Sequence, residues 1–350
     1  MKIFSIVGAR PQFIKLAPLS NALAKDHQEF IVHTGQHYDY AMSEKIFNDL
    51  EIRKPDIHLE TRSGSQASQT AEMMVKLEKE MMRAKPDIVI VFGDTNSTIA
   101  GTLSAAKLNI PIIHIEAGLR SYNRTMPEEI NRIVCDHISQ YLFVPTTTAL
   151  KILKKEGLEN NSFFTGDLMI DTMKNNLEIA LKKSKIVGQL HLEEENYNLL
   201  TLHRNYNVDN KLLLENILNQ LSQLNEQIIF PMHPRTRKMI SPTYSIPANI
   251  IVTEPKGYLD FITLEKHAKR IITDSGGIQK EAYILKKTCI TLRTETEWVE
   301  TVEEKWNLLI NPTDKKIAQK ILKFKVPKKQ KKIFGKDVTK KMVAIINTLK

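Results

Sequence analysis

The sequence has no run of 18 apolar residues, so it predicts no transmembrane helix. Its first residues, 1–7, form a short apolar segment that lacks the longer apolar region and the small-residue cleavage site of a signal peptide. Only two cysteines occur among the 350 residues, Cys135 and Cys289, and they lie far apart in the sequence. We therefore expect a cytoplasmic protein without integral membrane contact and without a disulfide framework.

Several motifs of nucleotide-dependent and metal-dependent enzymes are missing as well. No Gly-x-Gly-x-x-Gly loop follows the first apolar run, and no Walker loop, Cys-x-x-Cys pair or Gly-x-Ser-x-Gly elbow occurs. His33 and His37 are four residues apart, but Gly35 and the end of a predicted strand separate them, which disfavours a zinc site.

The positive charge of the chain is concentrated near its C-terminus. The whole sequence carries a net charge of +10, but residues 315–350 contain 13 lysines and one aspartate, a local charge of +12. Subtracting this segment leaves about −2 for the rest of the chain, so the region of the candidate site is not basic. A solvated lysine-rich surface explains the tail, and attachment to a membrane surface or a nucleic acid is the alternative. Because the tail lacks interleaved aromatic residues for base stacking, we expect no nucleic-acid partner.

The order of apolar runs predicts an α/β protein with two domains. Hydrophobic residues make up 42% of the chain and charged residues 26%, which is typical of a globular protein, and 350 residues suffice for two domains. Short β-type runs alternate with helical segments, and the pattern restarts in the second half, which predicts two Rossmann-like domains with parallel sheets. The predicted strands are 2–7, 30–34, 86–92, 111–115, 141–144, 198–202, 227–231, 249–253, 270–273 and 288–292, and the predicted helical segments are 11–25, 68–83, 97–107, 175–194 and 212–224. We place the hinge at 166–172, and we expect the two sheets to face each other across a cleft.

Three acids of the first half lie where a parallel sheet binds ligands. Asp94 and Glu116 each follow an apolar strand, so both belong at the carboxyl edge of the sheet, where open α/β sheets bind ligands. Glu128 follows Pro127, a normal start of a helix, and is expected in a first helical turn near the same edge. Paired carboxylates in a cleft indicate proton transfer to and from a substrate.

Two turns between a strand and a helix have the residues of a phosphate site. Arg10 stands at the turn after the first strand and Lys15 lies five residues later, and both can bind a phosphate, although a surface arginine in a loop is the alternative. Residues 274–277 (Asp-Ser-Gly-Gly) end a strand and begin a helix, where exposed N–H groups favour a diphosphate; a capped glycine turn is the alternative. Glu281, one helical turn later, can accept both hydroxyls of a ribose.

His203 is the third candidate of this kind, because it directly follows the predicted strand 198–202. A histidine at this position can act as an acid or orient a phosphate. A purely structural histidine is an equally simple interpretation, and the spacing alone does not decide between them.

Together these motifs resemble the non-hydrolysing UDP-N-acetylglucosamine 2-epimerase family. The similarity extends over the whole chain and is most specific at 8–11 (Gly-Ala-Arg-Pro), 116–120 (Glu-Ala-Gly-Leu-Arg), 127–132 (Pro-Glu-Glu-Ile-Asn-Arg) and 274–277. It implies the GT-B-like architecture, a homodimer, a UDP-sugar as substrate, and no metal or other cofactor. The implied domains are 1–168, with the catalytic carboxylates, and 169–335, with the UDP site, followed by a helix at 336–350 that packs back on the first domain.

The resemblance also implies a mechanism and the residues that carry it. Removal of the C2 proton lets UDP leave C1, and the resulting 2-acetamidoglucal takes UDP back while a proton reaches the opposite face of C2. The implied catalytic residues are Asp94, Glu116 and Glu128, with His203 beside the leaving phosphate. The residues implied to hold UDP and its ribose are Arg10, Lys15, Arg132, Ser275, Gly276, Gly277 and Glu281.

Departures from the family pattern bear on the substrate. The usual Glu after Arg-Pro is Gln12 here, Trp298 and Val299 follow Thr-Glu in the late motif, and Asn123 and Arg124 precede the Pro-Glu-Glu segment. These variants are similar to the branch that acts on UDP-2,3-diacetamido-2,3-dideoxyglucuronate, whose products enter O-antigen or capsule polymers, so UDP-N-acetylglucosamine and this uronate are the two candidate substrates. Arg124 can meet a C6 carboxylate, or it is a surface arginine. The loop at 36–39 differs from the type that binds an allosteric UDP-N-acetylglucosamine in some members.

Three other functions fit parts of the sequence. A GT-B glycosyltransferase would use the same UDP site, but it does not need three acids around C2. A non-enzymatic sensor would bind the UDP-sugar without turnover. The hydrolysing branch of the epimerases usually has Arg-Ala-Asp where residues 10–12 are Arg-Pro-Gln, and it is therefore a weaker match.

Overall fold

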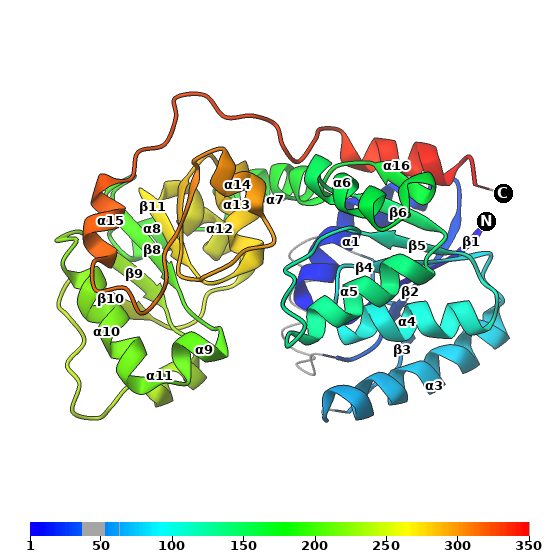
Figure 1. Ribbon diagram of the computed structural model, residues 1–350, viewed down its shortest axis with the longest axis horizontal. Coiled ribbons are helices and arrows are strands. Elements are labelled where there is room, and N and C mark those ends of the chain that lie inside the picture. Colours follow the sequence, from blue (N-terminus) through cyan, green and yellow to red (C-terminus); the bar gives the residue numbers. More distant parts are fainter. Residues whose placement is uncertain (37–52, 63, 350) are drawn as a thin grey trace. The chain divides into compact units, whose positions relative to one another are not determined.

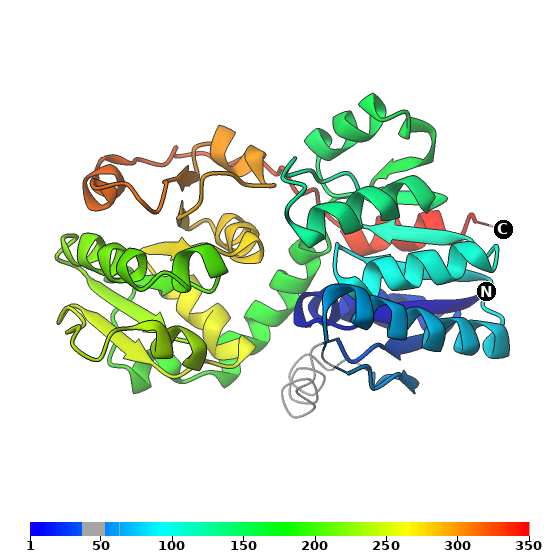
Figure 2. The ribbon, with the colours of Figure 1, turned by 60° about the horizontal axis from the view of Figure 1, so that its bottom comes forward.

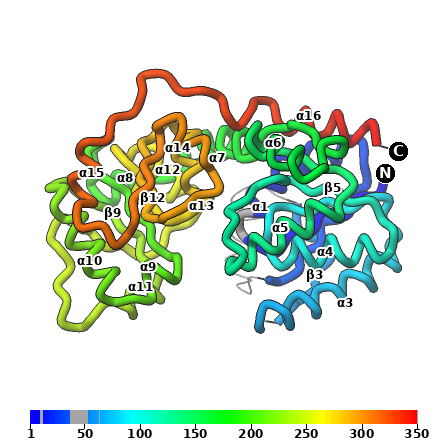
Figure 3. The backbone as a smooth tube through the Cα atoms, viewed as in Figure 1, coloured from blue at the N-terminus to red at the C-terminus, as the bar shows by residue number. Residues whose placement is uncertain are grey.

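The computed structural model describes residues 1–36, 53–62 and 64–349. The chain forms two compact units, unit 1 with Met1–Lys174 and Lys332–Lys350, and unit 2 with Asn175–Lys331 (Figure 1). Figure 3 traces the backbone from unit 1 into unit 2 and back to the C-terminal helix of unit 1. No helix in the described ranges is long and apolar enough to cross a membrane.

Unit 1 is built on a parallel sheet whose seven described strands have the order β3-β2-β1-β4-β5-β6-β7. The strands are β1 (Lys2–Val7), β2 (Gln28–His33), β3 (Ile57–His58), β4 (Ile88–Phe92), β5 (Ile112–Ile115), β6 (Tyr141–Val144) and β7 (Ser162–Phe164). Every residue of β4 and β5 is buried. Such continuous apolar runs are typical of parallel strands that helices cover on both faces.

The helices of unit 1 pack in two groups. They are α1 (Arg10–Leu23), α3 (Gln66–Ala84), α4 (Asn96–Lys107), α5 (Pro127–Ile138), α6 (Thr147–Lys155) and α16 (Val338–Ile346), with a 3₁₀ turn at Glu159–Asn161; α7 (Met169–Lys183) begins in unit 1 and continues into unit 2. Helices α3, α4 and α5 lie side by side (Figures 1 and 2). The C-terminal helix α16 lies against α1, and Thr339 N–H donates to Asp171 Oδ2 at 2.7 Å.

Small residues of α4 bring this helix close to the sheet. Ala100, Gly101 and Ala105 are buried, and a Cβ added at Gly101 would lie 2.7 Å from Ile6 Cδ1 of β1. The helix begins with Thr95 as its N-cap, whose hydroxyl accepts from Thr98 N–H. The close packing therefore positions the turn between β4 and α4, which contains Asp94.

Unit 2 repeats the architecture with six described parallel strands in the order β10-β9-β8-β11-β12-β13. The strands are β8 (Tyr197–Thr201), β9 (Gln227–Pro231), β10 (Ile250–Thr253), β11 (Arg270–Thr273), β12 (Thr288–Thr291) and β13 (Asn307–Leu309). The helices are α8 (Ile186–Gln189), α9 (Asn205–Val208), α10 (Lys211–Ser222), α11 (Pro234–Met239), α12 (Tyr258–His267), α13 (Gly276–Ile284), α14 (Val299–Glu303) and α15 (Ile317–Lys323). Leucines of α10 pack with Ile228 and Phe230 of β9 in the main apolar core of this unit.

Both sheets have the strand order of the Rossmann fold, in which the chain starts in the middle and then builds outward in both directions. The direction changes between β1 and β4 in unit 1 and between β8 and β11 in unit 2. In such sheets, ligands bind beyond the carboxyl ends of the strands at this switch point. The segments that follow these four strands are 8–10, 93–95, 202–204 and 274–276. Among the predicted site residues they contain Arg10, Asp94, His203, Ser275 and Gly276.

The α/β class with two Rossmann-like units is confirmed. All ten predicted strands are present, four with the predicted ends and six with ends shifted by one or two residues. Three short strands, β3, β7 and β13, were not predicted, because two or three residues contain too little periodicity. The helical stretch predicted at 175–194 is partly wrong: α7 ends at Lys183, α8 covers only Ile186–Gln189, and the residues after it are not helical.

Gly118 and Gly157 provide a test of how tightly the end of β5 is packed. Gly118 has φ +84°, and a Cβ there would lie 2.7 Å from Ala149 O, whereas Gly157 has φ +78° and no described atom within 4 Å of such a Cβ. We expect Gly157→Ala to lower the free energy of unfolding by about 1–2 kcal/mol from backbone strain alone. Gly118→Ala should cost about 1–3 kcal/mol more, because the methyl group also overpacks. Urea denaturation measures both, and equal losses would contradict the close packing.

Candidate functional site

Asp94 and Glu116 lie at the carboxyl ends of the neighbouring strands β4 and β5, as their positions in the sequence predicted. Gly93 N–H donates to Ile115 O at 2.9 Å, so the pairing of the strands continues beyond β4. Glu116 has a left-handed backbone, with φ +73°, and its N–H donates to Phe143 O of β6 at 3.0 Å. These backbone bonds hold the two acids at one edge of the sheet.

Each of these two acids forms an ion pair with a positively charged side chain, and the two positive side chains come from different helices. Lys15 of α1 pairs with Glu116, and Arg132 of α5 pairs with Asp94. Burial raises the pKa of Asp94, but the charge and hydrogen bond of Arg132, together with Lys15 and His114, outweigh it and hold the pKa below its usual value. Asp94 is therefore a carboxylate at neutral pH.

Glu128 and its neighbour Glu129 occupy different environments. Both lie in the first turn of α5, but Glu128 is half-buried whereas Glu129 is 1% exposed. Glu129 Oε1 accepts from Tyr122 N–H at 2.8 Å, and Oε2 accepts from Ser121 N–H at 2.8 Å and from Arg132 Nη1 at 2.9 Å. Glu129 thus anchors the loop before α5 and helps to orient the arginine that pairs with Asp94. The sequence did not mark Glu129.

A network of charged side chains, buried except at Glu156, supports the turns that carry the two acids. His114 Nε2 lies 2.7 Å from Gly93 O, and its Nδ1 lies 2.7 Å from Asp136 Oδ1. Asp136 Oδ2 accepts from Gly118 N–H at 3.0 Å and from Arg120 Nη1 at 2.6 Å, and Arg120 also pairs with Glu156. Burial raises the pKa of Asp136, but His114 and Arg120 hold it below its usual value. This network fixes the backbone at Gly93, just before Asp94, and at Gly118, just after Glu116.

Gln12 joins two of the turns that carry candidate residues. Its Oε1 accepts from Gly8 N–H at 2.8 Å and from Ala9 N–H at 3.0 Å, in the turn before Arg10. Its Nε2 donates to Phe92 O at 2.8 Å, at the end of β4. A glutamine can accept on one side and donate on the other, which a carboxylate cannot do, so the replacement of the usual Glu has a structural role here.

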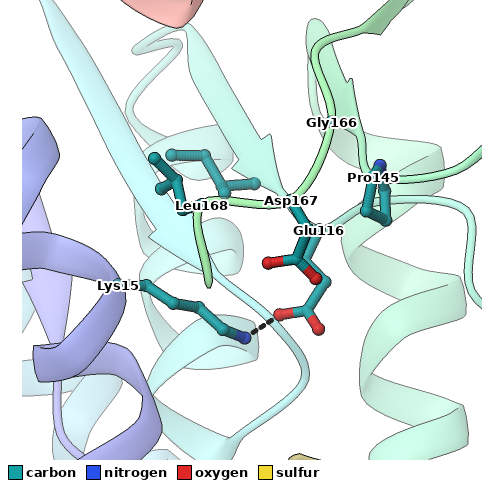
Figure 4. A pocket seen from close by; sticks show the side chains of 7 residues that line it. Lys15, Glu116, Pro145, Gly166, Asp167 and Leu168 are labelled. Atoms are coloured by element: carbon teal, nitrogen blue, oxygen red, sulfur yellow. Dashed lines mark hydrogen bonds and ion pairs between the residues drawn. The ribbon is translucent and has the colours of Figure 1, made fainter. Parts of the chain in front are cut away.

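A small pocket opens beside Glu116 in unit 1 (Figure 4). It is lined by Lys15, Ile115, Glu116, Pro145, Gly166, Asp167 and Leu168. Figure 4 shows the carboxylates of Glu116 and Asp167 close together, with Lys15 reaching Glu116. Asp167 is 3% exposed, and its Oδ1 accepts from Met169 N–H at 2.9 Å. The sequence did not mark this second acid as a site residue.

In unit 2, the predicted residues gather at the switch point between β8 and β11. His203 follows β8, and Asp274 Oδ1 lies 3.1 Å from its Nδ1. Ser275 is the N-cap position of α13, Gly276 and Gly277 begin that helix, and Glu281 lies 7% exposed in it. Gly276 is buried and approached closely, since a Cβ there would lie 2.1 Å from Glu297 Oε1. A side chain at position 276 would therefore collide with the carboxylate of Glu297, so the packing at the start of α13 requires a glycine.

The described structure covers only part of the remaining predicted residues. Residues 37–39 lie outside the described residues. The backbone of Arg10 begins α1, but its side chain is not among those described. Arg124 is exposed in the loop that Glu129 anchors. Within the described ranges, no three His, Cys, Asp or Glu side chains are grouped in a way that would hold a metal ion.

Comparison with known proteins identifies the family. The family model described as UDP-N-acetylglucosamine 2-epimerase matches residues 21–348. The chain belongs to this family. A UDP-N-acetylglucosamine 2-epimerase homolog of Methanococcus maripaludis is 52% identical over 330 residues, which cover 93% of this chain and 92% of the relative.

Two further relatives of the 2-epimerase family bear on the substrate. The UDP-2,3-diacetamido-2,3-dideoxy-D-glucuronate 2-epimerase of Pseudomonas aeruginosa is 43% identical, with 89% of this chain and 88% of the relative covered. The crystal structure of the UDP-GlcNAc 2-epimerase of Methanocaldococcus jannaschii, in complex with UDP-GlcNAc and UDP, is 42% identical, with a TM-score of 0.91 and 99% of each chain covered. The resemblance drawn from the motifs is therefore confirmed.

The residues that the sequence left unmarked in this 2-epimerase are mostly buried polar side chains. Glu129, Asp136 and Arg120 are 1%, 0% and 5% exposed. Of this network, His114 could have been noticed in the sequence, because it interrupts the apolar run Ile112–Ile115 of a central strand. Buried polar groups need partners, so such an interruption indicates a network.

Replacing Glu129 should loosen the loop before α5. In Glu129→Ala the N–H groups of Ser121 and Tyr122 lose their acceptor, and hydrogen bonds to charged groups contribute about 1.5–3 kcal/mol each. We expect amide hydrogen exchange at these two residues to rise about tenfold or more. Glu128→Ala is the matched control, since it removes the neighbouring carboxylate and should leave both amides protected. Unchanged exchange in Glu129→Ala would contradict the anchoring role.

Proposed function

We propose that this 2-epimerase inverts C2 of a UDP-2-acetamido sugar by eliminating UDP and adding it back, without hydrolysing the bond to UDP. A base removes the proton from C2, the bond from C1 to the diphosphate oxygen breaks, and a C1–C2 double bond forms in a 2-acetamidoglucal. UDP then attacks C1 again while a proton is delivered to the opposite face of C2. The reaction is internally balanced and needs no oxidant.

The observation that carries the proposal is the pair of acids at the ends of β4 and β5, each of which forms an ion pair with a positively charged side chain. Asp94 with Arg132 and Glu116 with Lys15 form two ion pairs at one sheet edge. We propose that Asp94, Glu116 and Glu128 are the acid–base residues on the two faces of C2. Such groups typically contribute about 10²–10⁴-fold each. If a phosphate group of the substrate binds Lys15 or Arg132, the ion pair with the carboxylate weakens, and the carboxylate becomes a stronger base.

Unit 2 is proposed to bind the UDP part. The N–H groups at the start of α13, with Ser275, Gly276 and Gly277, would receive the diphosphate, and Glu281 the ribose hydroxyls. His203 would lie beside the leaving phosphate, and Arg10, Lys15 and Arg132 would add positive charge. These donors stabilise the charge that develops when UDP leaves.

The proposal extends to the setting of the enzyme. We propose a cytoplasmic homodimer that supplies a UDP-sugar for a cell-surface polysaccharide such as O-antigen or capsule. Cys135 and Cys289 are both buried and free, and burial raises the pKa of each thiol, so neither is poised to form a disulfide. This fits the reducing cytoplasm.

Solvent deuterium tests the elimination mechanism. In D₂O, without NAD or metal, product formed from UDP-N-acetylglucosamine or the diacetamido uronate should carry deuterium at C2 in its NMR spectrum. Asp94→Asn and Glu116→Gln should lower turnover about 10²-fold or more, while UDP binding persists in an equilibrium titration.

Three results would overturn the proposal. Interconversion with protium retained at C2 would exclude elimination. Release of UDP only when an acceptor alcohol is added would instead indicate a glycosyltransferase, and binding without any turnover would indicate a sensor.

Arg124 is proposed to decide between the two candidate substrates. It is exposed in a loop whose backbone Glu129 anchors just before α5, and its guanidinium can bind a carboxylate with two hydrogen bonds. A neutral C6 hydroxyl offers no such partner. The relatives named for UDP-N-acetylglucosamine and for the diacetamido uronate are 52% and 43% identical to this chain, and the loop with Arg124 is the feature on which we base the choice of substrate.

Arg124→Ala tests this role directly. We expect kcat/KM for the diacetamido uronate to fall about 10–100-fold, as expected for loss of a charged hydrogen bond of about 1.5–3 kcal/mol. The value for UDP-N-acetylglucosamine should change by less than about threefold. Arg62→Ala, which removes an exposed arginine elsewhere in unit 1, is the control. Equal losses of kcat/KM for both sugars would contradict a role of Arg124 in selecting the substrate.

A further inference from the structure

His203 and Asp274 are brought together by the pairing of two strands in unit 2. β8 and β11 pair in parallel with Thr201 opposite Thr273, and the hydroxyl groups of these two threonines lie 2.7 Å apart. The residues that follow the two strands are therefore neighbours across the switch point. Asp274 is fully buried there, whereas the side chain of His203 is 52% exposed.

The carboxylate of Asp274 is surrounded by donors. Its Oδ2 accepts from His203 N–H at 3.1 Å, from Arg204 N–H at 3.0 Å and from Asn207 Nδ2 at 3.0 Å. Its Oδ1 lies 3.1 Å from His203 Nδ1 and also 3.1 Å from His203 N. Burial raises the pKa of Asp274, but the hydrogen bond and charge of His203, with Asn207 and Arg204 N–H, lower it below its usual value. Asp274 is therefore ionised and can only accept hydrogen bonds.

This arrangement dictates where the hydrogen of a neutral His203 ring must be. An ionised carboxylate cannot donate, so Nδ1 carries the hydrogen and donates it to Oδ1. The neutral ring then has its lone pair on Nε2. In this tautomer Nε2 is the ring nitrogen that can accept a hydrogen bond or a proton.

We propose that Asp274 is a positioning residue that holds His203 in the Nδ1–H tautomer, so that Nε2 handles the proton at the leaving diphosphate. The proton passes between Nε2 and a phosphate oxygen of UDP, and no other group is consumed. The second half of this proposal rests on the proposed epimerase function. The first half, the tautomer, holds for the resting protein whatever its substrate.

Other charged groups nearby cannot replace Asp274. Arg204 follows His203 directly, and Arg293, Glu297, Arg204 and Asp274 all act on the pKa of Tyr206, which burial raises. Arg293 pairs with Glu297 at 3.0 Å, so this carboxylate is already engaged. Asp274 is the carboxylate that contacts the ring of His203, with Oδ1 at 3.1 Å from Nδ1.

The wild-type protein provides the first test. Nitrogen-15 NMR of the histidine rings, with the His203 signals assigned by their loss in His203→Gln, should show the neutral ring with its hydrogen on Nδ1. This measurement needs no turnover and no variant of Asp274. A neutral ring with its hydrogen on Nε2 would overturn the proposal even if the protein is an active epimerase.

Asp274→Asn provides the second test. Three donors converge on Oδ2, so we expect the amide oxygen of the asparagine to take this position and its NH₂ group to face Nδ1. The ring should then switch to the Nε2–H tautomer in the NMR spectrum. If the protein is the proposed epimerase, kcat should fall about 10²-fold, within the range of acid–base groups, while KM changes less than about threefold.

Two controls separate positioning from a general loss of structure. Asp209→Asn removes an equal charge from an exposed ion pair with Arg235 in the same unit, and it should leave both kcat and the tautomer unchanged. In a His203→Gln background, Asp274→Asn should lower kcat by less than about threefold, because its effect passes through the ring. Additive losses in the double variant would show that Asp274 acts independently of His203 and would overturn the inference.

Failure of the inference can be told apart from failure of the proposed function. If the wild-type protein turns over no UDP-sugar, the kinetic arm fails together with the epimerase function, and the NMR arm still decides the tautomer. If the protein is an active epimerase but the ring keeps its tautomer in Asp274→Asn, only the positioning role of Asp274 is lost.

Discussion

Arg132 connects the parts of unit 1 on which the candidate chemistry depends. Its guanidinium pairs with Asp94, beyond β4, and with Glu129 at the start of α5. Glu129 in turn holds the backbone of the loop that contains Arg124. A single buried cation therefore links an acid proposed for catalysis to the loop proposed to select the sugar. Removing it would leave the buried carboxylate of Glu129 without its ion-pair partner, and leaving a buried charge unpaired typically costs about 3–5 kcal/mol.

The two units use the same physical device at their strand ends. In unit 1, buried Asp136 accepts from Gly118 N–H and Arg120 and contacts His114. In unit 2, buried Asp274 accepts from backbone N–H groups and contacts His203. Each aspartate has its pKa held below the usual value by these partners, although burial acts in the opposite direction. The difference lies in exposure: His114 is fully buried and supports a turn, whereas His203 presents its ring to solvent.

Much of this architecture could be predicted from the chain. Continuous apolar runs such as Ile88–Phe92 are typical of parallel strands covered on both faces, and their alternation with helical segments predicts a Rossmann-like sheet. Asp94 and Glu116 follow such runs directly, so their place at the sheet edge followed from the pattern. The short strand Ile57–His58 and the end of α7 could not be predicted, because packing against neighbours decides elements of this length.

The sequence by itself determined the class of fold, the two carboxylates at the ends of β4 and β5, the glycine turn at 276–277 and the family, since each depends on local order along the chain. The tertiary structure alone decided which polar residues act together. Glu128 and Glu129 are adjacent and chemically identical, yet successive helix residues point about 100° apart, so one is half-buried and the other anchors a loop. Likewise, Asp274 and His203 are 71 residues apart, and only the parallel pairing of β8 with β11 brings the carboxylate to the ring.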